Sequence, residues 1–143
     1  MGSHFESTGR ITKETYDRLI RTCEQALPDE ACGVLAQGPE SEAIDIVIPI
    51  RNVHPSPSVS FSFDPEEWTA AYFNMQKNRQ SLVGFFHSHP HTAATPSYRD
   101  SRGFLHESGL TYWIVSLTPG ASPDVKPYRP VQGSFVPIPL VLA

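Results

Sequence analysis

A short apolar run that leads straight into two histidines restricts the possible folds of this chain more than any other segment. Residues Leu82 to Phe86 are compactly apolar, which predicts a central, buried strand. The run continues without a break into His87-Ser88-His89-Pro90. Because side chains two residues apart in a strand point to the same side, the two imidazoles can converge on one point. The sequence therefore predicts a chemically active site at the end of a core strand.

One amphipathic helix is expected near the start of the chain, over residues 12–27. Thr12 is a suitable N-cap, and Pro28 is a suitable stop. Apolar residues recur at steps of three and four, which marks one buried helical face. These residues are Tyr16, Leu19, Ile20, Cys23, Ala26 and Leu27.

Short strands are expected after this helix. Residues 31–36 and 43–50 are apolar runs separated by Gln37-Gly38-Pro39, which indicates a hairpin. A loop over residues 51–58 is expected next, because it contains an asparagine and two prolines. Over residues 59–63, apolar residues alternate with serines, which predicts a half-buried strand.

A second helix is expected to begin at Asp64-Pro65. Aspartate is a favoured N-cap, and proline at the first helical position loses no hydrogen bond, since its missing N–H would have had no partner inside the helix. The inner face of this helix is expected to contain Trp68, Ala71, Tyr72 and Met75.

The second half of the chain is less regular. Ser97-Tyr98-Arg99-Asp100 has the spacing of a helix N-cap, which predicts a short helix to about residue 108. Residues 111–117 are rich in β-branched and aromatic residues and are expected to form a core strand, and residues 125–128 an edge strand. The tail after Pro130 is left unassigned. The alternation of helices and strands predicts an α/β fold.

Composition indicates a single folded domain. The 143 residues are 39% hydrophobic and only 18% charged, which is too apolar for a disordered chain. We expect residues 1–10 to be a tag remnant and leader and residues 11–143 to form one domain.

The basic residues are scattered singly and the net charge is −4, so nucleic acid is not an expected partner. Two cysteines, no apolar leader and no run of roughly 20 apolar residues favour a cytoplasmic protein that does not cross a membrane. The oligomeric state stays open, with a homodimer among the alternatives.

His87, His89 and Asp100 together could hold a metal ion. A catalytic zinc needs three protein ligands and one open position, and Pro90 and Pro96 bound a turn that could bring Asp100 back to the strand end. Each residue also has a simpler interpretation. A histidine is more often a packed or exposed side chain than a ligand, and Ser97 and Asp100 could only cap a helix.

The complete spacing favours the metal site. His87, His89, Ser97 and Asp100 match the pattern H-x-H-x7-S-x2-D, and Glu30 lies upstream between the first helix and the first core strand. In these residues, over roughly residues 11–118, the sequence resembles the JAMM (MPN-plus) zinc metalloprotease family. The resemblance implies a curved, mixed, mostly antiparallel sheet flanked by helices, an architecture similar to that of the cytidine deaminases.

Carried over to this chain, the resemblance implies one catalytic Zn²⁺ held by His87, His89 and Asp100, with a water molecule at the fourth position. It implies that Glu30 acts first as general base and then as general acid. Ser97 is implied to stabilise the negative charge that develops on the carbonyl oxygen.

Three neighbouring residues receive weaker interpretations. Ser88 is expected to help orient the ligand loop. Cys32 is expected to be a packing group rather than a nucleophile. His91 lies close enough in sequence to contact substrate or a second metal ion.

The resemblance also implies a substrate class. Family members cut at the C-terminal tail of ubiquitin or ubiquitin-like proteins, and the compact bacterial forms include a peptidase that frees cysteine from a sulfur-carrier protein. We therefore expect this protein to cleave a peptide or isopeptide bond at the tail of a ubiquitin-like or sulfur-carrier protein.

Three other functions are weighed against this one. The first is a noncatalytic scaffold of the same fold that binds metal, and the second is a simple metal-binding or storage protein. The third is a zinc nucleobase deaminase, which would need His-x-Glu and Pro-Cys-x-x-Cys; this chain has neither.

Overall fold

The computed structural model describes residues 9–97 and 109–143. The described elements are β1 (Gly9–Ile11), α1 (Lys13–Ala26), β2 (Cys32–Gln37), β3 (Ile46–Ile50), α2 (Pro65–Lys77), β4 (Ser81–His89), β5 (Thr111–Ser116), β6 (Asp124–Val131), β7 (Ser134–Pro137) and β8 (Leu140–Leu142). The short helix and Asp100 predicted over residues 98–108 lie outside the described residues.

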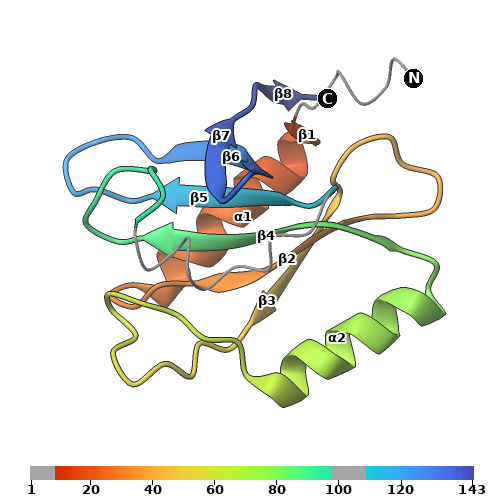
Figure 1. The fold of residues 1–143 in the computed structure, drawn as a ribbon, viewed down its shortest axis with the longest axis horizontal. Helices are drawn as coiled ribbons and strands as arrows, with labels where there is room; N and C mark the ends of the chain where they lie inside the picture. The colour runs from red at the N-terminus through yellow and green to blue at the C-terminus, as the bar shows by residue number, and fades with distance from the viewer. Residues whose placement is uncertain (1–8, 98–108) are drawn as a thin grey trace.

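Six of the described strands form a mixed sheet in the order β3-β2-β4-β5-β6-β7 (Figure 1). Within this sheet, β4 and β5 pair in parallel, and the other neighbouring strands are antiparallel. The predicted α/β class, with a mixed and mostly antiparallel sheet flanked by helices, is therefore confirmed. The predicted central strand is β4, which lies between β2 and β5.

The two helices cover opposite faces of this sheet. Neighbouring residues in the central strands β2, β4 and β5 alternate between two apolar clusters, as the period of two requires. On one face Leu19 and Cys23 of α1 pack against Leu35, Phe86 and Trp113. On the other face Met75 of α2 packs against Val34, Phe85 and Tyr112.

Both helices begin where the sequence predicts. The Thr12 side chain accepts a hydrogen bond from the Thr15 N–H at the start of α1, and the Asp64 side chain accepts one from the Glu66 N–H at the start of α2. Two residues expected on inner faces are exposed instead. Leu27 is 44% exposed because it has already left the helical conformation as the C-cap of α1, and Tyr72 of α2 is 41% exposed.

The predicted strand over residues 59–63 is wrong. Only an isolated bridge between Asn52 and Phe63 forms there. The Asn52 side chain supplies hydrogen bonds to this segment in place of a strand partner, since its amide donates to the Ser60 carbonyl and accepts from the Ser62 N–H. Val59 is 54% exposed as a result.

The tail gives two further differences from the sequence-based expectation. The segment at 125–128 is part of β6, which is not an edge strand because β7 pairs with its outer side. The unassigned end of the chain also forms β8, which pairs in parallel with β1 near the N-terminus (Figure 1). Among the described residues, neither helix is long and apolar enough to cross a membrane.

Candidate metal centre

The two histidines of β4 face each other at the end of the central strand. Their Nε2 atoms lie 3.2 Å apart, and the rings are 5.0 Å apart between centroids. Both side chains are almost fully shielded from solvent. Phe61 stacks on the His87 ring, with centroids 4.7 Å apart, and so restricts the orientation of that ring. The predicted convergence of the two imidazoles is confirmed.

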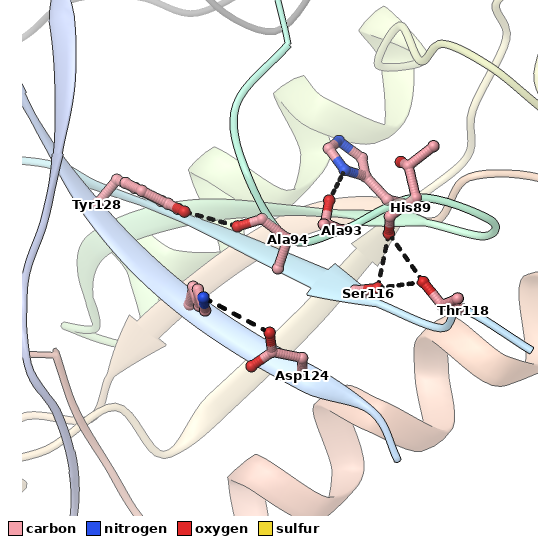
Figure 2. Close-up of polar contacts among 9 residues, drawn as sticks. His89, Ala93, Ala94, Ser116, Thr118, Asp124 and Tyr128 are labelled. Carbon is pink, nitrogen blue, oxygen red and sulfur yellow. Dashed lines mark hydrogen bonds and ion pairs between the residues drawn. The ribbon is translucent and has the colours of Figure 1, made fainter. Parts of the chain in front are cut away.

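A hydrogen bond orients the second imidazole. His89 Nδ1 lies 2.7 Å from the carbonyl oxygen of Ala93 (Figure 2). A carbonyl can only accept, so Nδ1 carries the hydrogen and Nε2 keeps its lone pair. A backbone carbonyl on the other ring nitrogen is the usual support of a metal-binding histidine. In the neutral imidazole of His89, the unprotonated Nε2 is therefore directed toward His87.

The donor set fits zinc. Two imidazole nitrogens bound to a tetrahedral zinc at about 2.0–2.1 Å stand about 3.4 Å apart, close to the observed spacing. Among the described residues, no third His, Cys, Asp or Glu joins them in a metal-binding group. Asp100, the third expected ligand, lies outside the part of the chain that the structure describes.

Glu30 lies at the same end of the sheet, just before the neighbouring strand β2. Cys32 of β2 pairs with His87, and the Ser88 N–H donates to the Ala31 carbonyl. Glu30 precedes Cys32 by two residues and therefore lies at the end of β2 that adjoins the histidine end of β4. Glu30 is only 6% exposed.

The main chain at Glu30 is held firmly by the loop after β3. The Glu30 N–H donates to the Pro57 carbonyl, and the Glu30 carbonyl accepts a hydrogen bond from the Asn52 amide at 3.0 Å. The same amide donates to the carbonyls of Pro57 and Ser60. Asn52 thus ties the loop and the acidic residue together, a role the sequence alone does not reveal because asparagine is common in any loop.

Cys32 faces the histidines but is a neutral thiol. Its Sγ donates to the Ile50 carbonyl, 3.3 Å away. Burial raises the pKa of Cys32 to about 12, with smaller contributions from the carboxylates of Glu30 and Glu67. A thiol with this pKa is neither a nucleophile nor a thiolate ligand near neutral pH, which agrees with the expected packing role.

Ser88 points to the opposite face of the sheet. Its Oγ accepts a hydrogen bond from the Ala31 N–H at 2.8 Å, which holds β2 and β4 together beside the site. Its contact is therefore with the strand that follows Glu30. Ser97 and His91, in the loop after β4, are both exposed.

Comparisons with known proteins place this fold in a family. The family of prokaryotic homologues of the JAB domain matches residues 12–130. A desampylase of Haloferax volcanii is 36% identical over 89 residues, which are 62% of this chain and 63% of that protein. This chain thus spans less than two thirds of that relative. A CysO-cysteine peptidase of Mycobacterium tuberculosis is 34% identical over 131 residues, which are 91% of this chain and 88% of that protein.

Solved structures agree with this placement. A Desulfitobacterium hafniense protein solved in solution superposes with a TM-score of 0.81 at 33% identity, over 94% of this chain and 92% of that one. A JAB1/MPN domain protein of Archaeoglobus fulgidus has the same fold, with a TM-score of 0.60 at 21% identity, over 92% of this chain and 98% of that one. The chain therefore belongs to the family of prokaryotic homologues of the JAB domain, as its resemblance to the JAMM/MPN proteins implies.

Proposed function

We propose that this protein is a zinc-dependent peptidase or isopeptidase that cleaves at the C-terminal tail of a ubiquitin-like or sulfur-carrier protein. The observation that carries the proposal is the pair of buried imidazoles whose Nε2 atoms lie 3.2 Å apart. His87, His89 and Asp100 would hold the metal ion. The names of the relatives, a desampylase and a CysO-cysteine peptidase, support the substrate class.

A zinc ion held there would act as a Lewis acid on the scissile carbonyl and would lower the pKa of its bound water toward neutrality. The remaining steps belong to side chains. The buried Glu30 carboxylate accepts a proton from the attacking water and later delivers it to the departing amine. The Ser97 hydroxyl donates a hydrogen bond to the carbonyl oxygen as negative charge develops there.

A flexible tail that ends in glycines suits this site. Both imidazoles and Glu30 are almost completely buried, so the scissile bond must come close to the sheet end. Glycine residues allow an extended backbone to approach without a side-chain clash, and such a segment can add to a sheet edge as a strand. We therefore expect the substrate to enter as an extended tail.

Metal analysis of His89→Ala tests the site. The purified wild-type protein is expected to contain close to one zinc per chain and the variant much less, because one of the imidazole ligands is gone. His91→Ala is the matched control, since His91 is an exposed histidine two residues away. Retention of zinc by His89→Ala would contradict the ligand assignment.

Glu30→Gln tests the chemistry in the same assay series. The variant is expected to keep its zinc and to cleave a carrier-protein conjugate about 10²–10⁴-fold more slowly, the usual effect of losing a general acid or base. Glu24→Gln, at an exposed position of α1, is the control. Equal turnover by wild type and Glu30→Gln would contradict the role of Glu30.

The alternative is a noncatalytic scaffold of the same fold that binds metal. Such a protein would bind zinc through the histidines but cleave no conjugate, and Glu30→Gln would leave it unchanged. The buried carboxylate beside the histidines favours the enzyme, because a scaffold has no use for it. A cytoplasmic location and a homodimer stay predictions from the sequence.

A further inference from the structure

The loop between β4 and Ser97 is fixed by side chains from three adjacent strands. Three successive main-chain carbonyls of this loop, those of residues 92–94, each accept a hydrogen bond (Figure 2). His89 of β4 donates to the middle one, as described above. The other two are reached from β5 and its C-terminal extension and from β6. No motif in the sequence predicts these contacts.

The first and third carbonyls receive hydroxyl donors. Ser116 Oγ donates to the Thr92 carbonyl at 2.6 Å, and Thr118 Oγ1 reaches the same oxygen at 3.3 Å. Tyr128 OH donates to the Ala94 carbonyl at 2.6 Å. The Ala93 carbonyl, which orients His89, thus lies between two anchored peptide groups.

The anchor at the third carbonyl is buried. Ala94 is 1% exposed and Tyr128 is 5% exposed, and both pack against Ile114. A buried carbonyl that loses its donor is left without a hydrogen-bond partner, which is unfavourable, so this contact strongly favours one loop conformation. Burial, and to a smaller extent Asp124, also raises the pKa of Tyr128, so the phenol remains a donor at neutral pH.

We propose that Tyr128 and Ser116 are positioning residues of the zinc site. By holding the peptide groups on either side of Ala93, they keep the Ala93 carbonyl on His89 Nδ1 and the lone pair of His89 Nε2 directed toward His87. This inference rests on the proposed zinc-binding function. It assigns a role in metal binding to two residues on strands that carry no ligand.

Tyr128→Phe tests the proposal because it removes the hydroxyl and keeps the ring. We expect the zinc affinity of the full chain, measured by competition with a chromophoric chelator, to fall about tenfold. This is the lower end of the usual effect of changing a residue that supports a metal ligand without binding the metal itself. The zinc affinity of Ser116→Ala should fall by less, because Thr118 still reaches the Thr92 carbonyl. Tyr16→Phe is the matched control, since Tyr16 packs on the opposite face of the sheet.

A spectroscopic measurement separates positioning from simple destabilisation. In NMR spectra of the metal-free wild type, the ring nitrogens of His89 should show hydrogen on Nδ1, whereas Tyr128→Phe should show a mixture of the two tautomers. A wild-type zinc affinity with an unchanged tautomer in both Tyr128→Phe and Ser116→Ala would overturn the inference. Failure of the wild type itself to bind zinc would instead overturn the proposed function.

Discussion

At the scale of single residues, Gly33 shows how closely β2 and its neighbours pack beside the site. A Cβ at this position would lie 2.3 Å from the Ile48 carbonyl oxygen and 2.5 Å from the Phe86 ring. The backbone of β3 and a fully buried ring leave no room for a methyl group. The close approach keeps β2 in register with β4, and hence helps to hold Glu30, which lies just before β2, at the histidine end of the sheet.

Gly33→Ala is therefore expected to destabilise the fold by at least about 2 kcal/mol, because overpacking forces backbone and ring to move. Urea denaturation followed by circular dichroism measures this loss. Gly38→Ala is the control, since the nearest atom to its Cβ would be an Asp45 carboxylate oxygen at 3.6 Å, an ordinary contact. If Gly33→Ala loses no more unfolding free energy than Gly38→Ala, β2 can shift to accommodate the methyl group, and the prediction is contradicted.

At the scale of elements, α1 determines where Glu30 enters the sheet. The helix packs on one face through Leu19 and Cys23, and the chain then needs only a short link to reach β2. The position of α1 along the sequence is set at its start by Thr12, whose side chain accepts from the Thr15 N–H at 3.2 Å. Its hydroxyl also lies 2.6 Å from that of Thr15.

Thr12→Ala should reduce the free energy of unfolding by about 1 kcal/mol, the usual value of an N-cap side chain. Thr12→Ser retains the hydroxyl and is expected to restore most of the loss. The comparison is made by urea denaturation of the three proteins under one condition. A serine variant as unstable as the alanine variant would mean that the methyl group, rather than the cap, is responsible.

At the scale of the whole molecule, two buried thiols make global stability depend on pH. Cys23 packs on the α1 face of the sheet, while Cys32 faces the histidines. Burial is the main cause that raises the pKa of each thiol from 9.0 to about 12. The unfolded chain therefore loses these protons at a lower pH than the folded protein does.

Because of this difference, the free energy of unfolding falls as the pH rises above 9. The stability from the protonated thiols is fully present below pH 9 and is lost as the pH rises toward 12, because deprotonation favours the unfolded chain. The slope is about 1.4 kcal/mol per pH unit for each thiol within this window. Urea denaturation at pH 8 and pH 10 measures it. The double variant Cys23→Ala, Cys32→Ala should show a shallower slope, and an equal slope would exclude the thiols as the cause.

Most of the elements could be predicted from the sequence, because local rules apply to them. The caps at Thr12 and Asp64, the helical period of α1 and the apolar run of β4 each act within a few residues. The facing imidazoles of His87 and His89 followed from the strand period alone. The strand predicted over residues 59–63 does not form, because the Asn52 side chain makes the hydrogen bonds that a partner strand would have made.

The candidate ligands, the helices and most core strands could be predicted without a structure, since they depend on residue type and short-range spacing. The three-dimensional fold was needed to show that the start of β2, just after Glu30, pairs with the histidine end of β4, that β7 covers β6, and that Tyr128 and Ser116 anchor the loop after β4. The reason is physical: these contacts join residues far apart in the chain through strand register and backbone carbonyls, and a carbonyl is present at every position, so it leaves no trace in the sequence.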